Sequence, residues 1–284
     1  RDAFNAVQPR VAAFYATIPH NQELWARLKA FDASQACAQL DSVRCRFVEE
    51  TIKDFRRHGA DLGTDDKIAL AEADVQLAKE TNRFGQNVVD DTDAYEFVIT
   101  DEMKLAGLPQ SAIAAAKASA VAKNIDGWRF TLQGPSVTAI LTHLNDRSIR
   151  EEFFRSYNSR ATGGPHDNRE RLGTILRLRQ RKADLLGYSD VSDLYLESRM
   201  VRSGAAAQAF VDGLRKKCEE AARRECQSLV GFFENENDGG AAFQPWDIAY
   251  VAEKQRKALY DFDEEEVRPY FSLKSVLDGL FELA

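Results

Sequence analysis

Hydrophobic residues recur along most of the chain at intervals of three and four residues, the spacing that places side chains on one face of an α-helix. Near the start, five residues follow this spacing before a proline interrupts it: Phe4, Val7, Val11, Phe14 and Ile18. Similar patterns predict helices over residues 24–31, 37–57, 64–105, 109–123, 136–144, 148–160, 167–186, 203–233 and 245–260. We therefore expect a mainly α-helical protein.

Strand signals are few. Residues 127–133 are the one credible strand, because Trp128, Phe130 and Leu132 alternate with polar residues until Gly134 and a proline break the pattern. The fold should thus contain at most a minor strand pair. This segment also suggests a division of the chain into antiparallel helices over 1–126 and a second helical region over 127–284.

Composition and charge narrow the class of protein. With 44% hydrophobic and 29% charged residues, the chain is typical of a folded globular protein. A net charge of −7 argues against a nucleic-acid partner, which would need a basic face. The basic residues of 169–182 alternate with leucines and isoleucine and are typical of a solvated helix face. A nucleic-acid binder built on that segment remains an alternative, and it would bind in a strongly salt-dependent way.

Nothing in the sequence has the spacing of a metal site. The four histidines, none of them four residues from another, are His20, His58, His143 and His166, so an H-E-x-x-H zinc helix is absent. The four cysteines form two pairs eight residues apart and are expected to be reduced thiols: Cys37, Cys45, Cys218 and Cys226. No apolar run is long enough for a membrane span, and we expect a cytoplasmic protein without a membrane partner.

Several segments, in order, resemble the thimet oligopeptidase and oligopeptidase A family of zinc metallopeptidases, the M3 family. They are 84–88 (FGQNV), 99–102 (ITDE) with 105–109 (LAGLP), 185–188 (LLGY), 244–250 (QPWDIAY), 259–260 (LY) and 268–271 (RPYF). The bacterial oligopeptidase A branch is the closer likeness, whereas the first 80 residues fit by helical character only. The chain starts at Arg1 within one apparent helix and stops within another, so we interpret it as an internal fragment of the N-terminal lobe.

The resemblance implies a two-lobed, neurolysin-like, almost wholly helical enzyme whose deep channel admits short peptides and excludes folded proteins. Residues 127–284 would form a channel wall leading toward a zinc catalytic domain. In this family the zinc site lies on an H-E-x-x-H helix, which this chain lacks. We therefore assign no catalytic or metal-binding residue, and we expect zinc in the full-length parent only.

Three residues are candidates for the substrate channel, each with a simpler explanation. Arg160 and His166 flank a glycine-rich turn from which they could reach a peptide carboxylate or backbone, although an ordinary surface loop is the simpler account of both. Trp246 could face substrate, but an aromatic residue just after a proline at a helix start is also typical of a packed anchor.

The predicted function is therefore that of a fragment of a zinc endopeptidase that hydrolyses short unstructured peptides. Alone it should be inactive and should depend on the missing C-terminal catalytic half as its partner. The alternative is a noncatalytic helical scaffold that binds peptides or a partner protein.

Overall fold

The computed structural model describes residues 7, 10–11, 14–15, 17–236, 240–261 and 267–284, and Phe4 of the predicted first helix lies outside them. The chain divides into two compact units. The first unit comprises residues 1–84 and 170–212, and the second unit comprises residues 85–169 and 213–284. Each unit has a hydrophobic cluster of its own.

The first unit is helical in all its described elements. These are α2 (Gln22–Asp32), α3 (Gln35–Ala38), α4 (Ser42–Arg57), most of α5 (Thr64–Ala94), α9 (Arg169–Leu185), α10 (Val191–Leu196) and the start of α11 (Gly204–Glu236). The Trp25 ring stacks on Phe55 with centroids 5.6 Å apart, which joins α2 to α4. The same indole donates from Nε1 to Asp61 Oδ1 at 2.9 Å, so its polar edge is satisfied while its ring is buried.

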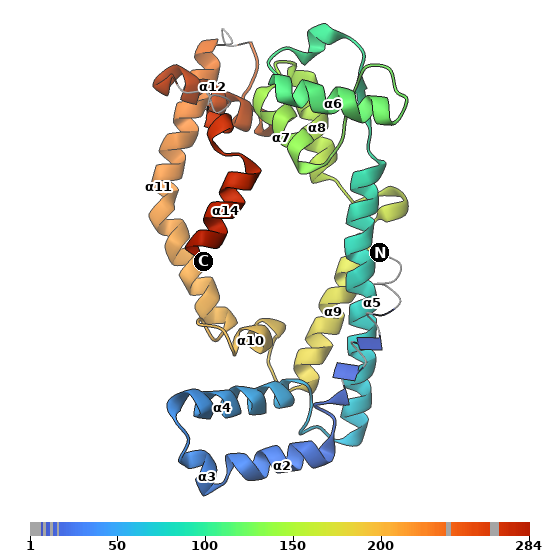
Figure 1. Cartoon of the computed structure of the whole chain (residues 1–284), viewed down its shortest axis with the longest axis vertical. Coiled ribbons are helices and arrows are strands. Elements are labelled where there is room, and N and C mark those ends of the chain that lie inside the picture. Colours follow the sequence, from blue (N-terminus) through green and yellow to red (C-terminus); the bar gives the residue numbers. More distant parts are fainter. Residues whose placement is uncertain (1–6, 8–9, 12–13, 16, 237–239, 262–266) are drawn as a thin grey trace. The chain divides into compact units, whose positions relative to one another are not determined.

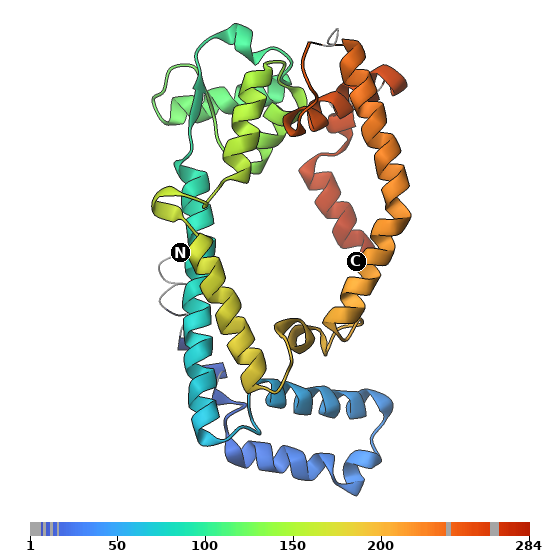
Figure 2. The same ribbon diagram turned by 180° about the vertical axis from the view of Figure 1, so that it is seen from behind.

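Helices α5 and α9 lie side by side within the first unit, as both views show (Figures 1 and 2). Lys182 Nζ contacts Asp74 Oδ1 at 2.7 Å, and Arg171 pairs with Glu80. Residue numbers fall along α5 as they rise along α9, so the two helices are antiparallel. The basic residues of α9 therefore serve in part to pair with acids of α5.

The second unit is built around a small sheet. Its elements are the end of α5, β1 (Phe97–Ile99), η1 (Glu102–Leu105), α6 (Gln110–Ala122), β2 (Trp128–Phe130), α7 (Gly134–His143), α8 (Arg147–Asn158), η2 (Gly164–His166), most of α11, η3 (Pro245–Asp247), α12 (Ile248–Tyr260), η4 (Arg268–Tyr270) and α14 (Leu273–Leu283). Strands β1 and β2 pair antiparallel, with Phe97 opposite Phe130 and Ile99 opposite Trp128.

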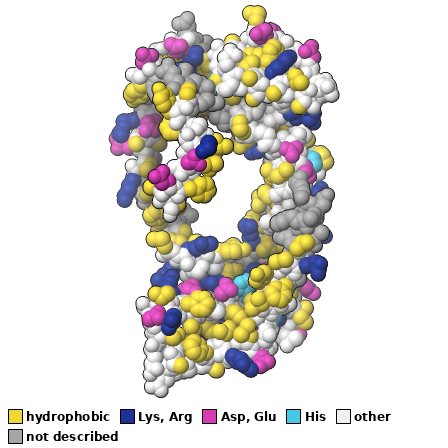
Figure 3. Space-filling model, viewed as in Figure 1, with side chains coloured by type: hydrophobic (Ala, Val, Ile, Leu, Met, Phe, Trp, Pro, Cys, Tyr) yellow, Lys and Arg dark blue, Asp and Glu magenta, His cyan; other side chains and the backbone are white. Residues whose placement is uncertain are grey.

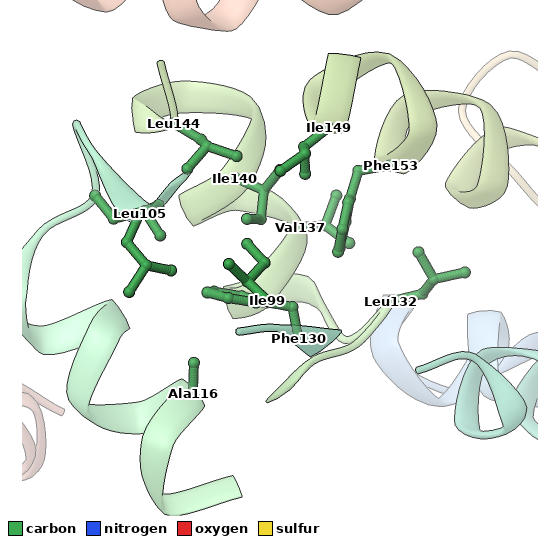
Figure 4. Packing of buried hydrophobic residues seen from close by; sticks show 11 residues of the cluster. Ile99, Leu105, Ala116, Phe130, Leu132, Val137, Ile140, Leu144, Ile149 and Phe153 are labelled. Carbon is green, nitrogen blue, oxygen red and sulfur yellow. The ribbon is translucent and has the colours of Figure 1, made fainter. Parts of the chain in front are cut away.

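The core of the second unit gathers around one face of this strand pair (Figure 4). Ile99 and Phe130 from the strands meet Val137 and Ile140 of α7, and Phe153 of α8 closes the cluster. Phe153 makes an edge-to-face contact with Phe97 at 5.4 Å between ring centroids. This packing fixes α8, whose first turn carries the site described below.

The mainly α class with a minor strand pair is confirmed. Helix ends were predicted less well. The helix predicted over 64–105 ends at Ala94, because the chain turns into β1 and then a 3-10 turn. Tertiary pairing overrides the helical pattern there, since β1 supplies the strand with which β2 pairs. The helix predicted over 37–57 is two helices, and α10 was not predicted.

The predicted boundary after residue 126 falls inside the second unit, and the division it proposes stays a prediction. Within the ranges given above, no helix combines the length and apolar composition needed to cross a lipid bilayer.

Candidate functional site

A buried carboxylate lies at the junction of η3 and α12. Asp247 is fully buried and accepts hydrogen bonds from two arginines of α8. Arg147 donates from Nη2 to Oδ2 at 2.7 Å and from Nε to Oδ1 at 3.0 Å. Arg150, only 2% exposed, donates from Nη2 to Oδ1 at 3.0 Å. We call Arg147, Arg150 and Asp247 the buried ion cluster.

Local sequence places both arginines on one side of α8. The side chain of Asp146 caps the helix by accepting from the backbone N–H groups of Ser148 and Ile149. Arg147 is then the first helical residue, and Arg150 follows three positions later on the same face. On the other side of the cluster, the N–H of Gln244 donates to Asp247 Oδ2 at 3.0 Å, which closes a capping box around η3.

Electrostatics keep Asp247 ionised. Burial opposes the charged form, but donation from Arg147 and Arg150 outweighs it, so the pKa of Asp247 is lowered from its ordinary value. Donation to Asp247 likewise raises the pKa of Arg147. Arg150 also donates from Nη1 to the carbonyls of Leu144 and Asn145 at 2.7 and 3.0 Å, whereas its Nε is buried without a hydrogen-bond partner among the described residues. The cluster thus ties α12 to the loop between α7 and α8.

Trp246 packs beside the cluster. It is 9% exposed and makes an edge-to-face contact with Phe154 of α8 at 6.2 Å between ring centroids. The Arg155 guanidinium lies 4.9 Å from the Trp246 ring centre, within range of a cation–π interaction. These contacts are those of a packed anchor. Whether Trp246 also faces substrate stays a prediction.

A small cavity of about 130 Å³ adjoins the cluster, lined by Arg147, Arg150, Tyr250, Lys254 and Phe233 among others. The Arg150 guanidinium stacks 3.8 Å from the centre of the Tyr250 ring. Tyr250 in turn donates from its hydroxyl to Asn145 Oδ1 at 2.9 Å. The lining groups are therefore occupied with one another, and the cavity is too small for more than a few non-hydrogen atoms.

Arg160 follows the last turn of α8 and points back to the protein. Its guanidinium lies 3.7 Å from the Tyr157 ring centre, and it donates to the Tyr157 carbonyl at 2.8 Å and to Thr92 Oγ1 at 3.3 Å. His166 ends η2 and is half-buried, and its Nδ1 is enclosed without a hydrogen-bond partner in the described part of the chain. These contacts differ from those of Trp246, so the structure does not join the three candidates into one site, and their substrate role stays a prediction.

A second polar network joins α5 to the loop after α8. Asn87, 3% exposed, donates from Nδ2 to Asn168 Oδ1 at 2.9 Å. Asp91 Oδ2 accepts the backbone N–H of Ala161 at 2.8 Å, and Ala161 has a left-handed φ of 53°. The network holds the loop that carries Arg160 and His166.

Sequence reasoning missed the arginine partners of Asp247 and the Asn87–Asn168 pair. One signal was available for Arg150, which lies between Ile149 and Phe153 on the apolar side of a predicted helix. A lone charge within such a stripe indicates a buried ionic partner. The identity of that partner could not be predicted, since Asp247 is 97 residues away.

The described residues do not fit a zinc site. Among them, no three His, Cys, Asp or Glu side chains lie close enough together to hold a metal ion. Tetrahedral zinc needs three or four such ligands. We therefore assign zinc chemistry to no residue of this chain, and it stays a prediction that the ligands lie elsewhere in a longer protein.

Comparison with known proteins places this architecture in a class of peptidases. The family model described as peptidase family M3 matches residues 140–284, which contain the buried ion cluster, α11, α12 and α14. The chain belongs to peptidase family M3. The oligopeptidase resemblance predicted from the sequence is thus confirmed.

The chain is similar to several curated proteins over its whole length. It is 33% identical to oligopeptidase A of Haemophilus influenzae, covering 100% of this chain and 42% of that protein. It is 31% identical to oligopeptidase A of Escherichia coli with the same coverage, and 30% identical over 92% of its length to dipeptidyl carboxypeptidase of that species. The chain spans about two fifths of the length of these relatives.

Proposed function

We propose that the chain is a noncatalytic, helical portion of a zinc-dependent oligopeptidase that hydrolyses short unstructured peptides. The observation that carries the proposal is the family match over residues 140–284, with whole-chain similarity to proteins named oligopeptidase A. In this proposal residues 127–284 form a wall of a channel that selects peptides by size. The isolated chain is inactive, because its described residues offer no set of metal ligands.

The partner of this chain is the catalytic part of the same enzyme. Support comes from α14, where Leu273, Val276, Leu277 and Leu280 recur at intervals of three and four residues. These side chains are 75%, 47%, 40% and 55% exposed, and hydrophobic side chains are visible on this helix in Figure 3. An uncovered apolar stripe of this kind is typical of a surface that meets another protein segment. The relatives have more than half of their length beyond the matched region to supply one.

The same proposal includes a cytoplasmic location and no membrane or nucleic-acid partner. One Arabidopsis relative, 33% identical, is named probable cytosolic oligopeptidase A, which supports the location. Another, also 33% identical, is named organellar oligopeptidase A, so compartment has to be determined by fractionation.

A chimera tests the proposal directly. This chain would replace the matching 42% of Escherichia coli oligopeptidase A, and cleavage of a quenched fluorescent peptide would be followed with and without a zinc chelator. We expect chelator-sensitive cleavage by the chimera and none by the 284-residue chain in the presence of zinc. Circular dichroism and bound zinc would establish that the chimera is folded and loaded.

Two results would overturn the proposal. Zinc-dependent cleavage by the chain alone would show that it carries a catalytic site. A folded, zinc-loaded chimera that binds the peptide without cleaving it would favour the noncatalytic scaffold instead.

A further inference from the structure

A groove in the described part of the first unit has more cations than anions among its lining residues. It has a volume of about 640 Å³ and lies between α4 and the loop of residues 197–203, which follows α10. Its charged lining residues are four bases and two acids: Arg46, Lys53, Arg199, Arg202, Glu50 and Glu197. A basic excess here contrasts with the net charge of −7 for the whole chain.

Both acids of the groove already have partners. Glu50 accepts from Lys53 Nζ at 3.0 Å, and this bond lowers the pKa of the Glu50 carboxyl. Glu197 accepts from the Tyr188 hydroxyl at 2.8 Å and from Arg57 Nη1 at 3.5 Å. Burial and the bond to Glu197 raise the pKa of Tyr188 to about 12, so this tyrosine stays a neutral donor.

Three guanidinium groups that line the groove make no hydrogen bond to either of its acids. Within the described residues, Arg46, Arg199 and Arg202 have no hydrogen bond or ion pair to a carboxylate, and all three are exposed. Arginine presents several donors in a planar fork that suits carboxylates. Arg46 attracts the Glu50 carboxylate through space without a hydrogen bond, and Arg199 and Arg202 add two further forks. Three exposed guanidinium groups around one groove create a local field that attracts anions.

The groove also has an apolar element. Met200 lines it with a fully exposed side chain, which is unusual for a residue of this type. Methionine adapts its shape to varied apolar partners and is common at surfaces that bind many peptides. Carboxylate binding beside an adaptable apolar contact fits a peptide that mixes acidic and hydrophobic residues better than it fits a uniformly charged phosphate chain.

We propose that this groove binds acidic segments of peptides through Arg46, Arg199 and Arg202. The inference deepens the proposed function, on which it rests for the biological source of the peptide, because it names the chemical class of peptide that the protein favours.

The test is binding of a fluorescein-labelled decapeptide that alternates glutamate and leucine, measured by fluorescence anisotropy with the 284-residue chain at low salt. The control peptide has glutamine in place of glutamate. We expect the acidic peptide to bind at least tenfold more tightly than the control, with affinity falling as salt rises. The double variant Arg199→Gln, Arg202→Gln should lose at least tenfold in affinity for the acidic peptide.

A matched control distinguishes binding in the groove from a general effect of losing two positive charges. Arg83→Gln, Arg181→Gln removes two exposed arginines of the same unit that do not line the groove, and it should bind as the unchanged chain does. Equal binding of the two peptides, or equal losses in the two double variants, would overturn the inference. So would tighter binding of a single-stranded RNA of equal charge.

The assay contains no cleavage step. Its failure would leave the peptidase proposal intact, and an inactive chimera would leave the groove's binding intact.

Discussion

Arg150 and Asp247 form an ion pair across 97 residues of sequence, with Nη2 and Oδ1 3.0 Å apart and exposures of 2% and 0%. Taking two charges out of water is costly, and their attraction offsets that cost only when geometry is good and the other polar atoms are satisfied. Asp247 meets this condition, because Arg147 and the Gln244 N–H fill its remaining acceptor sites. The pair therefore specifies how α12 docks on α8.

Removing the carboxylate should be strongly destabilising. Asp247→Ala leaves Arg150 buried without its ionic partner, a change that typically costs about 3–5 kcal/mol. Urea unfolding and hydrogen exchange of α8 and α12 would measure the loss. Asp278→Ala is the matched control, since its pair with Lys274 is exposed and such pairs contribute at most about 1 kcal/mol. Similar losses in the two variants would contradict a special role for the buried ion cluster.

The same carboxylate should make the second unit sensitive to acid. The pKa of Asp247 is lower in the folded protein than the unfolded value of about 3.9. Its contribution to stability is therefore fully present above about pH 4 and is lost as the pH falls through the lower, folded pKa. Protection of α12 amides from hydrogen exchange should decline over that acid range. The side chain of Asp247→Asn cannot titrate, so the part of the decline that Asp247 causes should vanish in this variant. A pH profile identical to that of the unchanged chain would refute the assignment.

The helical class, most helix starts and the family could be predicted from the sequence because they rest on local patterns. Asp167 accepts the Arg169 N–H at the start of α9, and Ser203 accepts the Ala206 N–H at the start of α11, close to the helix starts predicted at 167 and 203. β1 could not be predicted, because three residues carry too little periodicity and their strand character depends on β2, some 30 residues later.

The contacts of the candidate site were harder to predict from the sequence, for a related reason. Several residues that carry the family resemblance are turn and packing residues in the structure. Asp247 from 244–250 is an ion-pair partner, and Asn87 from 84–88 is a buried hydrogen-bond donor. Their partners come from distant segments with no pattern of their own, so a motif indicated the family without indicating the contact that each residue makes.

Gly107, in the segment 105–109, should not tolerate a side chain. It has a φ of 94°, and an added Cβ would lie 2.2 Å from the His143 carbonyl oxygen. Gly107→Ala therefore combines backbone strain of about 1–3 kcal/mol with a clash against backbone, which cannot move aside easily. Gly213→Ala is the control. That residue is inside α11 with open space around it, where alanine should stabilise by about 0.5–1 kcal/mol. The midpoint of thermal unfolding should fall in Gly107→Ala and rise in Gly213→Ala. An unchanged midpoint in Gly107→Ala would contradict the close packing.

Asn87 offers a test in which acid should restore stability. Its Nδ2 donates to Asn168 Oδ1 at 2.9 Å in a buried position. In Asn87→Asp an ionised carboxylate would lose this donor and face an acceptor oxygen, whereas the protonated acid could donate its O–H to the same oxygen. Burial raises the pKa of such a carboxyl, so the variant should be destabilised at pH 7.5 and recover as the pH falls through the raised value.

The control for this variant lies on the same helix. Asn82→Asp introduces the same charge at an exposed position of α5, where the carboxyl keeps an ordinary pKa and stability should vary little between pH 7.5 and 5. The difference in unfolding free energy between the two variants should therefore narrow on acidification. A constant difference would mean that position 87 is hydrated and that the Asn87–Asn168 bond does not hold the loop of Arg160 and His166.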